Sequence, residues 1–122
     1  MTIQRFEDLD CWKSARDLVR EVFILTNEPL FDRFRDLRWQ LQNAALSIMN
    51  NIAEGFDRFY LKERMLFLNY ATGSAGEVRS MLYTCLDLQL ITEMQFRELK
   101  GRAQSTQRQT AGLIRYLRKI SS

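Results

Sequence analysis

The sequence predicts an all-α fold in which four helices pack as an antiparallel up-down four-helix bundle within one domain, residues 1–122. Helix-breaking residues are rare, with one proline and five glycines among 122 residues, and helix interiors tolerate neither well. Apolar residues recur at spacings of three and four in four segments, which is the period of one helix face. Only a few residues separate these segments, so consecutive helices are expected to run antiparallel.

The first helix is predicted over residues 8–26. Asp8 and Asp10 suit its first turn, where the helix dipole favours acidic side chains. The residue before Pro29 resists the helical conformation, so the helix is expected to end there. The predicted buried face has members three or four residues apart: Leu9, Trp12, Ala15 or Arg16, Val19, Phe23 and Thr26.

The second helix is predicted over residues 33–55, with Asp32 as its N-cap and Gly55 as its left-handed stop. Two apolar stripes run along it. The first, which is expected to face the core, consists of Phe34, Leu37, Leu41, Ala44, Ile48 and Ile52. The second consists of Trp39, Leu46, Met49, Ala53 and Phe56. Because a monomeric bundle needs one such stripe per helix, the second predicts an interface between copies of the chain.

The third helix is predicted over residues 61–90. It is apolar most of the way round, which is typical of a central helix. Gly73 and Gly76 lie in its middle, and each glycine costs about 1 kcal/mol relative to alanine. Close approach of another helix backbone would offset that cost, so the pair predicts a tight helix crossing.

The fourth helix is predicted over residues 93–120. Thr92 and Gln95 have the spacing of a capping box at its start. Its apolar seam alternates spacings of three and four: Phe96, Leu99, Ala103, Thr106, Thr110, Leu113, Leu117 and Ile120. The threonines weaken this seam, which favours a bundle face over a free coiled coil.

A catalytic or metal site has few residues to support it. The chain contains no histidine, which removes the commonest general base and metal ligand. No phosphate-binding glycine loop or cysteine cluster is present. Glu54 and Glu77 stand on apolar faces, but they are expected about 20 Å apart along the bundle. Each is therefore expected to accept hydrogen bonds or pair with an arginine. The sequence predicts no enzymatic activity, no bound metal and no cofactor.

The two cysteines and the composition predict a cytoplasmic protein. Cys11 and Cys85 are isolated, which is typical of buried small hydrophobic residues. The first residues lack the apolar core of a secretory signal. No apolar run approaches the roughly 18 residues of a membrane span, so no membrane contact is expected.

The net charge of +3 is concentrated in the last helix. Residues 92–122 carry seven basic and two acidic side chains, whereas the remainder carries eleven and thirteen. Six of the cations fall within an arc of about 100°, opposite the apolar seam: Arg97, Lys100, Arg108, Arg115, Arg118 and Lys119. Such a row would neutralise phosphates and release counterions. The alternative is a solvated helix face, but repetition of the row in an oligomer favours nucleic-acid binding.

The predicted turn between the second and third helices, residues 56–60, places three aromatic residues beside Arg58. Aromatic rings stack on unpaired bases, and arginine binds phosphate. The alternative, which we favour, is that Phe56 and Phe59 staple the turn.

Residues 5–92 resemble a family of four-helix-bundle proteins encoded by intervening sequences within bacterial 23S ribosomal RNA genes. The opening Phe6-Glu7-Asp8-Leu9 looks like the start of its first helix. The segment Ser47-Ile48-Met49-Asn50-Asn51-Ile52-Ala53-Glu54-Gly55 is similar to its motif Ser-Ile-Pro-x-Asn-Ile-Ala-Glu-Gly, with Arg58 following. Gly73, Ser74 and Glu77 match its third-helix signature. Met49 replaces the usual proline, so a straighter second helix is expected.

The resemblance implies a barrel-like homopentamer. It also implies kinship with the positively charged accessory proteins of diversity-generating retroelements, which partner a reverse transcriptase and nucleic acid. Together with the basic row, it predicts a non-enzymatic homo-oligomer that binds RNA or an RNA–DNA intermediate through the six cations and Arg58. The alternative is a protein-interaction adaptor, an accessory subunit of a retroelement reverse transcriptase.

Overall fold

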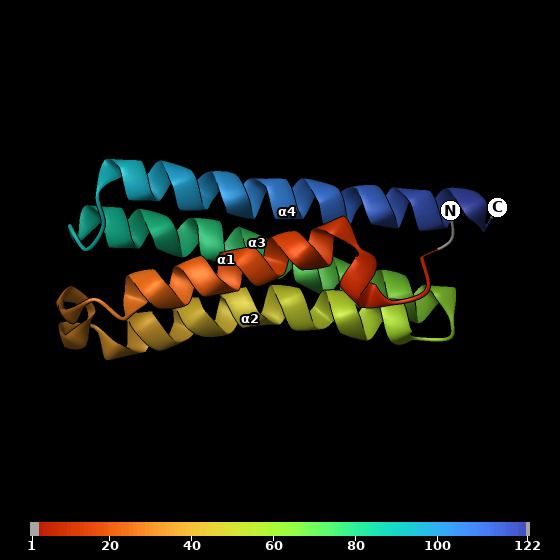
Figure 1. Ribbon diagram of the computed structural model, residues 1–122, viewed down its shortest axis with the longest axis horizontal. Coiled ribbons are helices and arrows are strands. Elements are labelled where there is room, and N and C mark those ends of the chain that lie inside the picture. The colour runs from red at the N-terminus through yellow and green to blue at the C-terminus, as the bar shows by residue number, and fades with distance from the viewer. Residues whose placement is uncertain (1–2, 122) are drawn as a thin grey trace.

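The computed structural model describes residues 3–121, which form four long helices. These are α1 (Asp10–Thr26), α2 (Arg35–Asp57), α3 (Leu61–Asp87) and α4 (Glu93–Ile120). Short 3-10 turns, Phe6–Asp8 and Pro29–Arg33, precede α1 and α2. The helices run up and down in turn, and no strand occurs within the described range (Figure 1). The all-α four-helix bundle predicted from the sequence is confirmed.

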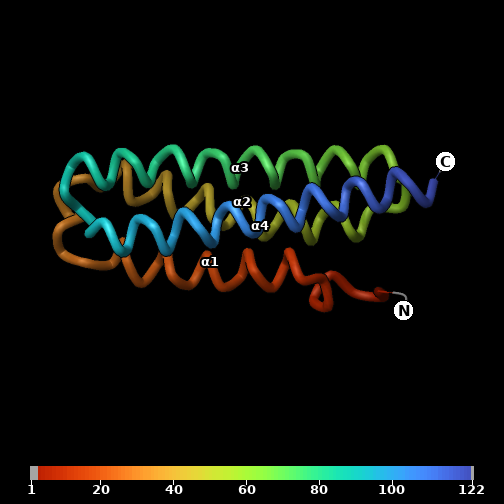
Figure 2. Tube along the Cα trace, turned by 90° about the horizontal axis from the view of Figure 1, so that it is seen from above, coloured from red at the N-terminus to blue at the C-terminus, as the bar shows by residue number. Residues whose placement is uncertain are grey.

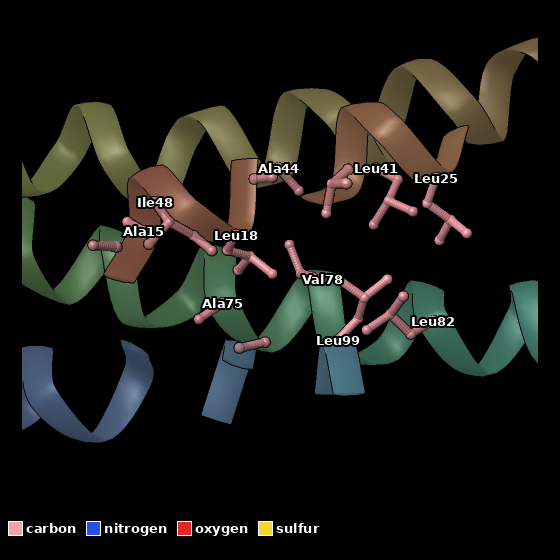
Figure 3. Close-up of a cluster of buried hydrophobic side chains, with 14 of the residues drawn as sticks. Ala15, Leu18, Leu25, Leu41, Ala44, Ile48, Ala75, Val78, Leu82 and Leu99 are labelled. Atoms are coloured by element: carbon pink, nitrogen blue, oxygen red, sulfur yellow. The ribbon is translucent and has the colours of Figure 1, made fainter. Parts of the chain in front are cut away.

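The four helices stand at the corners of a square. α1 and α3 each pack against both α2 and α4, so α1 lies diagonally across from α3, as Figure 2 shows. The core between them is aliphatic, and Figure 3 shows Leu18, Leu41, Ile48, Val78 and Leu82 converging from three helices. Each such side chain stabilises the fold by about 1.5–3 kcal/mol when fully buried. The turn between α2 and α3 and both chain ends lie at one end of the bundle.

The buried face of α1 agrees with the prediction at Leu9, Trp12, Ala15 and Thr26, which are buried. At the other positions it is rotated towards a neighbouring face. Leu18, Val22 and Leu25 are buried, whereas Val19 is half-buried and Phe23 is exposed. Two overlapping apolar faces are available on this helix. Packing between α2 and α4 selects the one with three aliphatic side chains.

Both predicted boundaries of α2 are wrong. Pro29 opens a 3-10 turn, so α2 begins at Arg35, and Asp32 instead accepts a hydrogen bond from Arg38 at 2.6 Å. At the other end the helix continues through Gly55 to Asp57, and no glycine in the described range has a positive φ. A Cβ at Gly55 would lie 3.0 Å from the carbonyl oxygen of Arg64. Glycine is therefore required there by the close approach of α3.

α3 ends earlier than predicted, in a left-handed cap. Gln89 has a φ of 59°, and the Leu90 amide donates to the Cys85 carbonyl at 2.9 Å, which is the Schellman pattern. The expectation of a fully central helix is also wrong, because Leu66, Tyr70 and Tyr83 are exposed.

The glycines of α3 do not mark a crossing within the described chain. A Cβ at Gly73 would meet nothing within 4 Å, and one at Gly76 would meet only the side chain of Gln107, at 3.8 Å. Gln107 bridges α3 and α4 here, since it donates to the Thr72 carbonyl and accepts from Arg79, both at 3.0 Å. The Gln107 side chain thus lies beside Gly76, where the backbone of another helix is predicted from the sequence.

α4 begins with the predicted capping box. The Gln95 amide donates to the Thr92 hydroxyl at 3.0 Å, and the Thr92 amide donates back to the Gln95 side chain at 2.8 Å. The seam is buried from Phe96 to Thr110, but then shifts to Ile114, and Ile120 is exposed. Such a drift is expected where a straight helix of period 3.6 carries a heptad seam. No helix in residues 3–121 has the length and apolar character needed to span a membrane.

Candidate nucleic-acid interface

The outer face of α4 carries the predicted cations. Arg97, Arg108, Arg115 and Arg118 are exposed, and none of their guanidinium groups forms an ion pair or hydrogen bond within residues 3–121. Lys119 is also exposed. At 1.5 Å per residue, the row from Arg97 to Lys119 is about 33 Å long. Within residues 3–121, no carboxylate pairs with the four arginines of this row.

Lys100 is held differently from the arginines. Its Nζ donates a hydrogen bond to the Tyr83 hydroxyl at 2.9 Å and lies 5.2 Å from the centre of that ring. It also lies 5.6 Å from the centre of the Phe96 ring. These contacts anchor the ammonium group over the α3–α4 seam, so it contributes charge at a fixed position rather than on a freely moving side chain.

The two acidic residues of α4 both lie in its first half. Glu93 is in the first turn, and Glu98 pairs with Arg102, their side-chain atoms 3.5 Å apart. No acidic residue follows Glu98 in the sequence. The half of α4 that carries Arg108, Arg115 and Arg118 is therefore uniformly basic.

Arg58 does not belong to this row. It lies at the turn between α2 and α3, where it forms an ion pair with Glu54 and stacks over the Phe67 ring at 4.6 Å. The pairing expected for Glu54 is confirmed. Because the carboxylate neutralises its charge, Arg58 is expected to attract a phosphate more weakly than the arginines of α4 do.

The aromatic residues of the turn separate into two roles. Phe56 is half-buried against the core, as expected for a residue that staples the turn. Phe59, however, is 86% exposed and Tyr60 is 66% exposed. The stapling role assigned to Phe59 is therefore wrong, because its ring points away from the bundle.

The predicted self-association stripe is only partly open. Met49, Ala53 and Phe56 pack at the edge of the core, and Leu46 is half-buried. Trp39 remains 64% exposed. Exposed Leu66 and Tyr70 on α3 were not assigned to an interface from the sequence, although the all-round apolar character of that helix signalled them.

Polar motif residues of α2 and α3 form hydrogen bonds that link the two helices. The hydroxyl groups of Ser47 and Ser74 are hydrogen-bonded at 2.8 Å, and the Asn51 side chain donates to the Ser47 carbonyl and hydroxyl. Gly55 allows the two helices to approach nearby. This part of the motif joins α2 to α3.

Glu77 departs from its prediction. It is exposed and has no hydrogen-bond or ion-pair partner within the described chain. It lines a cavity of about 150 Å³ with Ser74, Trp39 and Met81 on the α2–α3 surface. The expected arginine partner is not supplied by residues 3–121.

The cysteines are buried, as predicted. Burial raises the pKa of both thiols, that of Cys85 to about 11. They are therefore protonated near neutral pH and are poor nucleophiles. Within residues 3–121, no group of three His, Cys, Asp or Glu side chains is placed to hold a metal ion.

Comparison with known proteins agrees with this architecture. A family model described as 23S rRNA-intervening sequence protein matches residues 7–112. A crystal structure of a protein of unknown function, from the S23 ribosomal protein family of Bacteroides thetaiotaomicron, superposes with a TM-score of 0.77 at 16% sequence identity. The match covers 85% of this chain and 97% of that chain. No curated protein matches the sequence.

Proposed function

This chain belongs to the family of 23S rRNA-intervening sequence proteins, and from that premise we propose that it is a non-enzymatic homo-oligomer that binds RNA in the cytoplasm. The observation that carries the proposal is a row of exposed arginines on α4, namely Arg97, Arg108, Arg115 and Arg118, which have no acidic partner within residues 3–121. Maintaining such a row concentrates positive potential along about 33 Å of surface. A polyanion relieves the mutual repulsion of these charges and releases its own counterions on binding.

Self-association is the second part of the proposal. Trp39 on α2 and Leu66 and Tyr70 on α3 are large apolar side chains exposed to water. Contact with further copies of the chain would cover them, and a closed ring of five would repeat the α4 row around its circumference. Repetition raises the local potential and the number of phosphates contacted at once.

The test is RNA binding measured by fluorescence anisotropy as salt rises from about 50 to about 200 mM. Affinity is expected to fall steeply, with a logarithmic slope of about −0.7 per phosphate contacted on a single strand. The triple variant Arg108→Gln, Arg115→Gln, Arg118→Gln is expected to bind much more weakly and to lower the magnitude of that slope by about 2.

A matched control removes the same number of charges elsewhere. Lys13, Arg33 and Arg35 are exposed and lie on α1, on the connection between α1 and α2, and at the start of α2. Their replacement by glutamine is expected to leave RNA affinity close to that of the unsubstituted protein. Equal losses in both triple variants would indicate a general charge effect, and an unchanged affinity in the α4 variant would reject the α4 row as the contact surface.

A further inference from the structure

Two aromatic rings project into solvent at the end of the bundle where α2 turns into α3. The rings of Phe59 and Tyr60 meet edge to face with their centres 5.1 Å apart, and both residues are largely exposed. Keeping two large rings in water is unfavourable. Their exposure calls for a reason beyond the fold itself.

The turn that carries these rings is firmly held. The Arg58 amide donates to the Gly55 carbonyl at 3.3 Å, and the Arg64 side chain donates to the Arg58 carbonyl. The Arg64 amide donates to the Tyr60 carbonyl at 3.0 Å. The backbone on both sides of Phe59 is therefore fixed, and the rings form a preorganised platform rather than the tip of a loose loop.

A groove lies at the same end of the bundle, between the N-terminal segment, α2, α3 and the last turns of α4. Its volume is about 690 Å³, which lies within the range of roughly 300–1,000 Å³ typical of small-ligand sites. Phe56 of α2 and Arg64 of α3 line it together with Tyr116, Leu117 and Ile120 of α4. Ile3, Gln4 and Leu9 of the N-terminal segment complete the lining. Flat apolar surfaces and an arginine thus face one another across a space that could take a planar ring.

Basic residues lie at the same end of the bundle as the groove. Arg115, Arg118 and Lys119 lie on the same last turns of α4, with no acidic residue after Glu98. Figure 1 shows this end of α4 and the α2–α3 turn at the same end of the bundle. Planar rings next to a basic surface match the two parts of a nucleotide, since bases stack on aromatic side chains and phosphates contact cations.

We propose that the bundle end formed by the α2–α3 turn and the last turns of α4 binds unpaired nucleobases, with Phe59 and Tyr60 as the stacking platform. The preferred RNA then has a single-stranded end or loop, because the bases of a continuous duplex are stacked on one another and do not reach a protein ring. This inference rests on the proposed function and specifies its ligand.

The experiment uses a 12-nucleotide RNA with 2-aminopurine near one end, either single-stranded or in a blunt duplex. The protein is expected to change the fluorescence of the single-stranded probe through stacking, and to bind the single strand at least tenfold more tightly than the duplex. The double variant Phe59→Ser, Tyr60→Ser is expected to lose about tenfold or more of single-strand affinity, with duplex affinity unchanged.

Two controls separate this inference from the proposed function. The variant Ile24→Ser, Met94→Ser removes two exposed apolar side chains at the opposite end of the bundle and should bind like the unsubstituted protein. The α4 triple variant should lose both RNA forms. The stacking site is overturned if the protein binds both RNA forms equally and the Phe59–Tyr60 variant has the same affinities as the unsubstituted protein. The phosphate contacts would then stand, and the rings would be assigned to a protein partner instead. Failure of both RNA forms to bind overturns both proposals.

Discussion

The hydroxyl groups of Ser47 on α2 and Ser74 on α3 lie 2.8 Å apart in a hydrogen bond that joins the two helices. The Asn51 side chain donates to the Ser47 hydroxyl at 3.0 Å and so completes a chain of three polar groups. The Ser47 oxygen accepts this bond and is also hydrogen-bonded to the Ser74 hydroxyl. Loss of Ser47 leaves the Ser74 hydroxyl without this hydrogen bond, and loss of Ser74 leaves the Ser47 hydroxyl bonded only to the Asn51 side chain.

Ser74→Ala is therefore expected to lower the free energy of unfolding by about 1 kcal/mol. The loss from Ser47→Ala should be similar, and the double variant should lose less than the two single losses combined, because one bond is counted in both. Urea denaturation measures all three. Ser80→Ala, at an exposed site on the same helix, is the control and should stay within about 0.5 kcal/mol of the unsubstituted protein. Strict additivity of the two serine variants would contradict the shared bond.

Substitution by alanine is expected to change the stability in opposite directions at Gly55 and at Gly73. A Cβ at Gly55 would lie 3.0 Å from the Arg64 carbonyl oxygen and 3.1 Å from the Phe67 Cβ, so Gly55→Ala should destabilise the protein by about 1–3 kcal/mol. A Cβ at Gly73 meets nothing within 4 Å of the described chain. Gly73→Ala should thus raise the stability of the isolated subunit by up to about 1 kcal/mol.

Thermal melts at low protein concentration compare the two glycine variants. A Gly73→Ala protein that is stable but no longer self-associates would place Gly73 at a contact between copies. Stabilisation by Gly55→Ala would contradict the close approach of α2 and α3 seen at that position.

The number and order of the helices could be predicted from sequence because periodicity and capping are local properties. Thr92 with Gln95 is sufficient to define the start of α4, and the first apolar stripe of α2 is long enough to fix its buried face. The roles of the glycines were not predictable in this way. A sequence shows that Gly55 and Gly73 lack side chains, but only the packing of α3 shows which of them meets a neighbour.

Some features of the candidate site could likewise be predicted from the sequence, and others could not. The outward direction of Arg108 and Arg115 follows from 100° per residue on a single helix. The contact between Lys100 and Tyr83 depends on the register of α4 against α3, which the sequence of neither helix contains. The exposure of Phe59 likewise depends on how Arg64 holds the turn.

The buried thiols predict a decline of stability in alkaline solution. Burial raises the pKa of Cys85 to about 11, above its usual value of 9.0. As pH rises through that interval, the unfolded chain releases this proton while the native chain retains it, so the stabilisation is complete below pH 9 and is lost towards pH 11. Urea midpoints measured from pH 7 to pH 10.5 should decline less steeply for Cys85→Ala than for the unsubstituted protein. Parallel profiles for the two proteins would contradict this role of Cys85.

Trp39 provides the test of self-association. Its ring is 64% exposed beside a small cavity that it lines with Glu77 and Met81, and covering it requires a second surface. Light scattering should give the unsubstituted protein a mass about five times that of the 14.5 kDa chain. Trp39→Lys should reduce this mass, because a lysine ammonium loses its hydration when the interface closes. Ile24→Lys introduces the same charge at an exposed site on α1 and should leave the mass unchanged. A monomer in the unsubstituted protein would remove the case for an apolar interface, since Trp39 would then tolerate water without a partner.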